Sequence, residues 1–482
     1  MSLFIKKPLD SLLAQAGDSE KGLKRTLGPG NLIALGIGAI IGAGLFVRTA
    51  SAAGDAAGPA VVISYIVAGV GCAFAGLCYA EFAAMIPISG SAYAYAYVTM
   101  GEFMAWVIGW ALILEYALAG ATVGIAWSQY LNSLLGGAIP YQWCHGPMET
   151  SADGVQGIIN VPALFIVLVV TLILIKGMQE SAMINAIIVF IKVSIVLVFI
   201  ALGWQFINDA NYTPFLIPET TPGHESWSKH GWGGILGGAG IVFFAFIGFD
   251  AVSTAAQEAK NPKRDMPIGI LGSLVICTLL FVLFSHVLTG MANWQEFKIA
   301  GKEASVVYAI NKYMIGYEWL GTLITVAILA GFTSVILVML MGQSRVFFSM
   351  SKDGLVPKVF SDLHPKFRTP YKSNLILFVC VAPFAGFLPE SLVGNLTSFG
   401  TLFAFVLVCI GIWVMRVKNP DAPRPFKTPL VPLVPLLGAG ICGALIIALD
   451  RQTQIMALGW LAVGLVVYFT YGKKNSVLRK EQ

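Results

Sequence analysis

The sequence predicts an all-α integral membrane protein with about twelve transmembrane helices. Two observations lead to this prediction: its composition and its hydropathy. Of its 482 residues, 57% are hydrophobic and only 11% are charged, whereas an average soluble domain has about 25% charged residues. Its mean hydropathy is +0.79. Apolar runs of about 20 residues, each long enough to cross the hydrocarbon core of a bilayer, recur along the whole chain.

The predicted spans divide the chain in order. They lie near 30–50, 60–84, 102–134, 161–177, 181–207, 232–257, 267–291, 317–350, 373–389, 391–415, 431–449 and 453–472. The third and the eighth exceed the thickness of a bilayer, which predicts that they tilt or extend beyond it. The N-terminus has no apolar core followed by a cleavage site, so no cleaved signal peptide is predicted.

The distribution of Lys and Arg predicts the orientation. With the N-terminus in the cytoplasm, 23 of the 30 basic residues fall in cytoplasmic segments and six, Arg48 among them, fall outside. This asymmetry follows the positive-inside rule. The prediction is a protein of the cell membrane with a cytoplasmic segment 1–28, a transmembrane domain 29–472 and a cytoplasmic tail 473–482.

The first span contains GIGAIIGAGLF, Gly36 to Phe46, with four glycines in eleven residues. Glycine costs about 1 kcal/mol relative to alanine inside a helix. Close helix packing through Gly38 and Gly42, spaced as GxxxG, is one explanation. A dinucleotide fingerprint fails, because Ile41 stands where it needs glycine. The third explanation is a discontinuous helix whose unwound middle faces a buried site.

The sixth span, GGILGGAGIVFFAFIGFDAVSTAAQE, is also glycine-rich and places Asp250 at membrane depth. Interrupted helices at corresponding positions of two halves are a pointer to a transporter site. The sequence therefore predicts a five-plus-five inverted repeat, about 29–207 and 231–416, with two further helices at about 430–472. Because unwinding frees N–H groups on one half-helix and C=O groups on another, the breaks suit the carboxylate and ammonium of a zwitterion.

Several stretches resemble the amino acid–polyamine–organocation transporter superfamily, in its bacterial cationic amino acid transporter branch. They are GIGAIIGAGLF, CYAEFAAMIPISGSAYAYAYVTMGE, FFAFIGFDAVSTAAQEAKNPKRDMPIGI, GQSRVFFSMSKDGLVPKVF and NLTSFGTLFAF. The resemblance covers nearly the whole chain. It implies the inverted-repeat fold, discontinuous helices 1 and 6, and alternating access around a central amino acid site.

The resemblance also implies site residues. The unwound part of the first span, whose N–H groups would hold the carboxylate, would comprise Ile40, Ile41, Gly42, Ala43 and Gly44. In the sixth span, the carbonyls that would receive the amino group are those of Phe244, Ala245 and Ile247, with the Phe244 ring as an outer gate. Many relatives have Ser or Thr where this chain has Ala43, so a hydroxyl contact to the carboxylate is missing here.

Ionisable residues at bilayer depth are costly and are functional candidates by default. Lys192 is either a structural lysine bound by carbonyls of the first span or, as the resemblance favours, an ammonium at the cation position of sodium-coupled relatives that couples transport to protons. Glu115 is a proton carrier or substrate contact, or else a glutamate hydrogen-bonded to a neighbouring helix.

Each of three further residues has two possible roles. Asp250 could cap the inner half-helix of the sixth span or contact substrate. Glu258 could form a gate ion pair or a solvated pair with Lys260, Lys263 or Arg264. The resemblance places Met339 in the pocket for the substrate side chain, where it would favour small or medium neutral substrates; ordinary packing is the alternative.

The predicted function is secondary active amino acid uptake coupled to protons. An exchanger without proton coupling, an amino-acid-binding sensor and a channel are the alternatives. An enzyme is not expected, since the intramembrane ionisable residues are few and unlike. No metal site or cofactor is predicted, because the five histidines lack ligand spacing. The expected partners are the amino acid, protons and lipid; nucleic acid is excluded and an accessory subunit is not required.

Overall fold

The computed structural model describes residues 3–8, 26–87, 91–151, 153–177, 182–297, 305–367 and 369–480. Within these residues, eight helical stretches are long and apolar enough to cross a membrane, and four shorter apolar helices accompany them. Each of the twelve predicted spans overlaps one of these, although only the eight longer stretches are long enough to cross a membrane. The chain is therefore an all-helical membrane protein, as predicted, and its described residues form two isolated β-bridges but no sheet.

The helices of the membrane region follow the predicted order. They are α2 (Pro29–Ile40), α3 (Ala43–Phe46), α4 (Arg48–Ala52), α5 (Val61–Met85), α7 (Glu102–Leu134), α9 (Val161–Lys176), α10 (Ala182–Gly203), α11 (Gly231–Val242), α12 (Ala251–Thr254), α13 (Pro262–Met291), α16 (Glu318–Lys352), α17 (Tyr371–Phe387), α18 (Glu390–Lys418), α19 (Leu433–Ala448) and α20 (Arg451–Val467). The short 3-10 segments η6 (Phe243–Phe246) and η7 (Ala256–Glu258) complete the sixth span.

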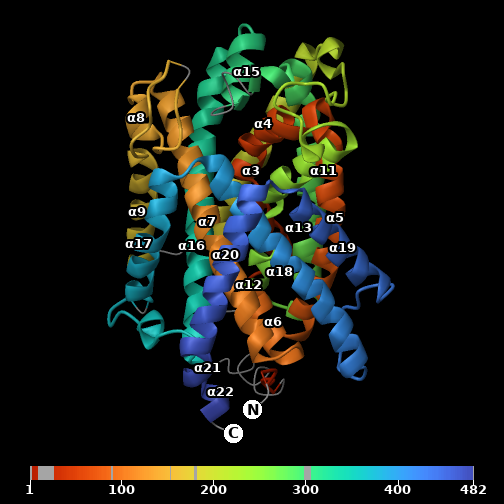
Figure 1. Ribbon diagram of the computed structural model, residues 1–482, viewed down its shortest axis with the longest axis vertical. Coiled ribbons are helices and arrows are strands. Elements are labelled where there is room, and N and C mark those ends of the chain that lie inside the picture. Colours follow the sequence, from red (N-terminus) through yellow and green to blue (C-terminus); the bar gives the residue numbers. More distant parts are fainter. Residues whose placement is uncertain are drawn as a thin grey trace.

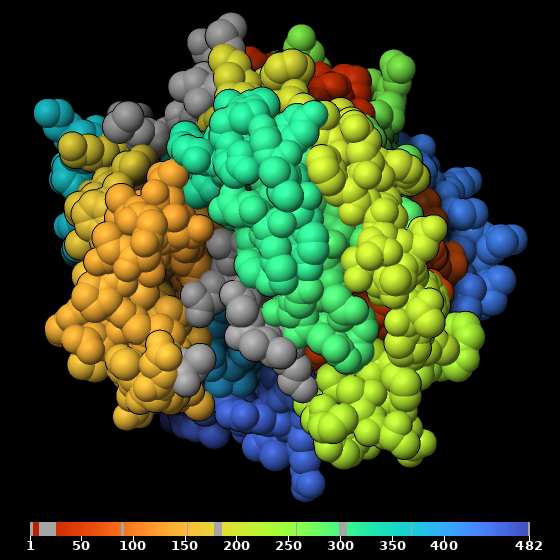
Figure 2. Space-filling model, turned by 90° about the horizontal axis from the view of Figure 1, so that it is seen from above, coloured from red at the N-terminus to blue at the C-terminus, as the bar shows by residue number. Residues whose placement is uncertain are grey.

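Shorter helices lie at the two ends of the bundle. They are α6 (Ser91–Thr99), α8 (Tyr141–Cys144), α14 (Trp294–Glu296), α15 (Ser305–Tyr313), α21 (Lys473–Asn475) and α22 (Val477–Lys480). Both termini lie at one end, here called the terminal face (Figure 1). The opposite end, the distal face, carries α8 and α15; Figure 2 shows the latter helix across its centre.

Local sequence signals set several helix ends. α9 begins at Val161–Pro162, and the Asn160 side chain caps it by accepting from the N–H of Ala163 at 3.1 Å. It ends at Lys176, and Gly177 follows with a φ of +75°, which glycine adopts without a steric penalty. Asp450 caps α20 in the same way, accepting from the N–H of Thr453 at 2.9 Å.

The long helices α7 and α16 pack side by side through small residues. Gly120 of α7 faces Leu340 of α16, and Gly342 of α16 lies against the ring of Tyr116. Small residues allow two backbones to approach closely, which drives helix association where lipid removes the hydrophobic driving force. With 33 and 35 residues, these helices are the two that the sequence predicts to exceed the bilayer.

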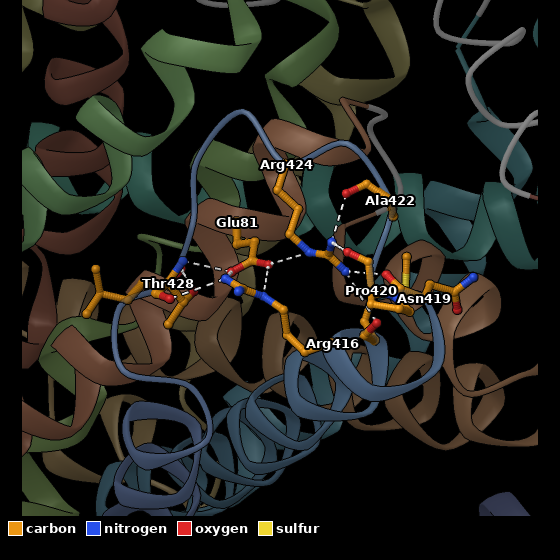
Figure 3. Close-up of polar contacts among 9 residues, drawn as sticks. Glu81, Arg416, Asn419, Pro420, Ala422, Arg424 and Thr428 are labelled. Atoms are coloured by element: carbon orange, nitrogen blue, oxygen red, sulfur yellow. Dashed lines mark hydrogen bonds and ion pairs between the residues drawn. The ribbon is translucent and has the colours of Figure 1, made fainter.

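A buried carboxylate joins α5 to α18 and the following loop on the terminal face (Figure 3). Glu81 is fully buried and accepts from Arg416 at 2.9 and 2.8 Å. It also accepts from the N–H of Thr428 at 2.8 Å and lies 3.3 Å from Nε of Arg424. One carboxylate thus holds the end of α18 and the loop that follows it to α5.

Candidate functional site

The first span is broken at Ile41 and Gly42. Ile41 caps the end of α2 in an extended conformation, and α3 begins directly after Gly42. The unwound segment is shorter than predicted, since Ile40 is still helical and Ala43 and Gly44 already belong to α3. All five residues are buried.

The start of α3 offers N–H groups. Those of Gly42, Ala43 and Gly44 have no hydrogen-bond acceptor among the described residues. In contrast, the carbonyl of Gly44 accepts from the Tyr65 hydroxyl at 3.2 Å, and that of Phe46 accepts from Tyr130 at 2.9 Å. With these carbonyls occupied, the beginning of α3 presents donors only, which suits an anionic group.

The sixth span is broken from Ile247 to Asp250, between η6 and α12. Gly248 has φ +117°, a conformation that side chains of L-residues rarely adopt. The carbonyl of Phe244 accepts from the N–H of Ile247 at 3.2 Å. Those of Ala245 and Ile247 accept no hydrogen bond from the described part of the chain. This break therefore offers acceptors, the complement of the first.

The two breaks pack directly against each other. A Cβ atom at Gly44 would overlap the backbone of Ala245, and one at Gly248 would lie 2.9 Å from the carbonyl carbon of Ala39. Only glycine permits this approach at either position. The donor groups of the first break and the acceptor groups of the second are therefore brought close together in the buried interior.

Lys192 of α10 binds the carbonyl end of the first break. It is 3% exposed, and its ammonium donates to the carbonyl oxygens of Gly38 at 2.9 Å and Ile41 at 3.0 Å. Gly331 of α16 leaves room for the lysine stem, since a Cβ there would lie 2.5 Å from Cε. A cavity of about 10 Å³ adjoins the lysine, about the smallest that holds one water molecule.

Asp250 does not cap the inner half-helix as one reading predicts. It occupies the N-cap position of α12 but makes no side-chain capping hydrogen bond. Instead its carboxylate accepts from the Tyr116 hydroxyl at 2.7 Å and from the N–H of Gly248 at 3.3 Å. The aspartate therefore connects the second break to α7, where Glu115 is the neighbouring residue.

Glu115 is fully buried, and neither of its carboxylate oxygens has a hydrogen-bond partner among the described residues. Its backbone packs against Gly400 of α18, which places Thr401, the next residue of that helix, near it. A buried polar group without a partner costs about 1–3 kcal/mol. The unused acceptors of Glu115 can bind donor groups that a ligand brings.

Met339 of α16 lies one helical turn beyond a residue that contacts the first break. A Cβ at Gly42 would lie 3.3 Å from Val335, and residues four apart share one face of a helix. Met339 is 2% exposed. The structure thus brings this face of α16 to the first break.

Comparisons with known proteins decide the family. A profile described as "Amino acid permease" matches residues 27–468. The chain belongs to the amino acid permease family. It is therefore a transporter and not an enzyme.

The permease is similar over its full length to two proteins of Bacillus subtilis (strain 168). It is 43% identical to the branched-chain amino acid permease BcaP, over 99% of both chains. It is 41% identical to the methylthioribose transporter, over 99% of this chain and 100% of that one. Cationic amino acid transporter 4 of Mus musculus is 33% identical over 86% of this chain and 63% of its own.

The permease also contains a buried arginine, Arg48, which the sequence analysis counts among the residues outside the membrane. Arg48 of α4 is 1% exposed. Its guanidinium lies 3.5 Å from Glu390, donates to Asn395, and stands 6.0 Å from the centre of the Phe244 ring. The cluster of Arg48, Glu390 and Asn395, the distal cluster, joins α4 to α18 between the breaks and the distal face. The burial of Arg48 could have been predicted from the sequence, because position 48 falls within the predicted first span, near 30–50.

On the terminal side, Glu258 pairs with Arg345 of α16 at 4.0 Å, not with Lys260, Lys263 or Arg264. Both side chains are 25% exposed, so this pair is a weak one. Leu27 and Ala259 form a parallel bridge, with hydrogen bonds of 3.0 Å from Leu27 N–H to Glu258 and 2.9 Å from Lys260 N–H to Leu27. Contacts between distant segments therefore lie on both sides of the breaks: the distal cluster on one side and the Leu27–Ala259 bridge on the other.

Proposed function

We propose that the permease is a secondary active transporter that takes up an amino acid together with protons by alternating access. The observation that carries this proposal is the pair of facing breaks. Gly42, Ala43 and Gly44 offer free N–H groups, and Ala245 and Ile247 offer free carbonyls. A zwitterion supplies the acceptor and the donors that these groups lack, and a half-helix N-terminus favours its carboxylate.

Lys192 is the proposed coupling residue. Its ammonium supplies a hydrogen bond to each of two carbonyls at the first break. Loss of its proton removes the positive charge and one N–H, so the lysine head then holds the end of α2 less strongly. Because lysine can lose its proton when it is buried, its protonation and the geometry of the break are linked in this proposal.

The proposed substrate is a small or medium neutral amino acid. Val335 and Met339 give the α16 side of the site an apolar face. The relative named as a branched-chain amino acid permease supports this class, whereas the cationic transporter and the methylthioribose transporter name other solutes. Glu115 can accept from the substrate or carry a proton, and Phe244 beside Arg48 is the proposed outer gate.

Orientation and internal symmetry are part of the proposal. Residues 29–207 and 231–416 are two inverted repeats that each begin with an interrupted helix, and α19 and α20 follow them. Both termini lie at one face (Figure 1), and most Lys and Arg residues fall in segments predicted to lie on that side. We assign the terminal face to the cytoplasm of a cell whose plasma membrane holds the permease.

Uptake into sealed proteoliposomes tests the proposal. Radiolabelled L-leucine should accumulate against its gradient when the outside is made acidic, and unlabelled L-leucine should compete better than L-arginine or 5-methylthioribose. Glu115→Gln should weaken uptake by tenfold or more, whereas Glu318→Gln, at the exposed start of α16, should not. Leucine exchange that ignores the pH gradient identifies an exchanger, and binding without uptake identifies a sensor; either result overturns the proposal.

A further inference from the structure

A hollow of about 700 Å³ opens on the terminal face, away from the two breaks. The first turns of α13 form one wall, with the basic side chains of Lys263 and Arg264 and the apolar ones of Ile268 and Leu271. Pro425 and Phe426, from the loop between α18 and α19, form the other. One end of the hollow is therefore basic and the remainder apolar.

The basic end has no counter-ion among the residues that the structure describes. Lys263 and Arg264 are exposed, and neither forms an ion pair within the described part of the chain. Asp265, the acidic residue beside them, is buried and accepts from the N–H of Asn261 at 3.1 Å. Beside the hollow, Glu81 of α5 is shared by Arg416 of α18 and Arg424 of the loop, so that cluster keeps an excess positive charge.

The loop wall is held in place from both sides of Phe426. Arg424 donates to the carbonyls of Pro420 at 2.7 Å and Ala422 at 2.8 Å (Figure 3). The hydroxyl of Thr428 donates to the carbonyl of Leu77 at 3.0 Å. The hollow is thus preformed, so a ligand does not have to order the loop on binding.

An exposed apolar surface continues from the hollow toward the middle of the bundle. α5 lies between α13 and α19: its Gly76 packs on Leu274 of α13, and its Gly71 packs on Ile441 of α19. The apolar residues exposed along these three helices include Ile66, Val70, Ile268, Val275, Leu279, Leu433 and Leu436. A ligand whose head binds the basic end can lay hydrocarbon chains along this surface.

We propose that this hollow binds an anionic phospholipid of the leaflet on the terminal face. Lys263 and Arg264 bind the phosphate, and the acyl chains follow the exposed side of α13 over α5. Basic pockets between membrane helices recognise anionic headgroups in this manner. A soluble anion would use the same two cations but would leave the apolar part of the site unused.

Native mass spectrometry of the purified full-length permease with phosphatidylglycerol or phosphatidylcholine tests the proposal. Each basic residue near the surface contributes about 1 kcal/mol to binding of anionic lipid. Lys263→Gln/Arg264→Gln should therefore weaken phosphatidylglycerol binding about 30-fold. The matched control is Lys358→Gln/Lys366→Gln, which removes two exposed cations elsewhere on the terminal face and should bind as the wild type does.

Three results would overturn the assignment. The first is equal affinity of the wild type for the two phospholipids. The second is unchanged phosphatidylglycerol binding in Lys263→Gln/Arg264→Gln, or in Lys263→Gln alone if the double variant does not fold. The third is binding of inorganic phosphate or glycerophosphoglycerol as tight as that of the intact lipid, which would identify a site for a soluble anion.

Discussion

The ammonium nitrogen of Lys192 lies 2.9 Å from the carbonyl oxygen of Gly38. Through this contact, and through a second one to Ile41, a side chain of α10 holds the end of α2 where the first span unwinds. The bond is buried and charge-assisted, which makes it stronger than a neutral hydrogen bond. It joins an ionisable group to a segment of the proposed substrate site.

Lys192→Met should reduce leucine accumulation driven by a pH gradient at least tenfold. The substitution keeps most of the side-chain volume but removes the donor to two buried carbonyls, each worth about 1–3 kcal/mol. Proteoliposome uptake measures the loss, and counterflow exchange without a gradient should remain detectable. Accumulation at the wild-type rate in Lys192→Met would remove this lysine from the coupling mechanism.

Gly44→Ala should abolish leucine binding and destabilise the permease by about 1–3 kcal/mol, as overpacking of a filled interior does. The added methyl group would overlap the backbone of Ala245 and force the two breaks apart. Gly459→Ala in α20 is the matched control, since its methyl group would meet nothing within 4 Å. Thermal unfolding and leucine binding provide the readouts; normal binding by Gly44→Ala would show that the breaks need not touch.

Glu390→Gln should lower stability by up to about 3–5 kcal/mol, because it leaves the buried guanidinium of Arg48 without its carboxylate. Arg48→Met/Glu390→Gln should recover part of this loss, since both charges are then removed. A double-mutant cycle on thermal stability gives the coupling between the two residues. Additive effects would mean that the pair does not hold the distal side together.

Met339→Ser should extend the competition profile toward basic amino acids, because a shorter polar side chain leaves more room beside Val335. Inhibition of leucine uptake by L-arginine should become at least several-fold stronger. Met415→Ser, at the terminal end of α18, is the control for loss of a buried methionine elsewhere. A profile unchanged by Met339→Ser would place this residue outside the pocket.

Asp450, which binds Asn395 of the distal cluster, should stay ionised over the pH range used for transport. The Asn395 amide donates to the Asp450 carboxylate at 2.9 Å. Partial burial raises the pKa of Asp450, but hydrogen bonds from Thr453 and Asn395 outweigh this effect and hold the pKa below its ordinary value of 3.8. A lowered carboxyl pKa adds stability above the ordinary value, which is lost only as the pH falls further. Asp450→Asn should therefore shift thermal stability equally at pH 5.5 and pH 7.5; a difference between the two would contradict this assignment.

Hydropathy was sufficient to locate the long membrane helices, because each has to be apolar over most of a bilayer's thickness. The density of glycine near Gly42 and Gly248 also identified both breaks, since close backbone approach requires glycine there. The contacts made across the bundle could not be predicted. The partner of Glu258 is Arg345 on a distant helix, and Asp250 binds Tyr116 instead of capping α12. Such pairings depend on how helices rotate about their axes, which hydropathy alone does not fix.

The short bridge between Leu27 and Ala259 limits how the terminal side can open. It connects the residues just before the first span to those just after the sixth, so segments from the two halves of the chain are held together by backbone hydrogen bonds. An outward motion of both segments together preserves the bridge, whereas a motion of either segment alone has to break its two hydrogen bonds. Release of substrate toward this face is therefore expected to be a concerted step, in which the two paired segments move together as one rigid body.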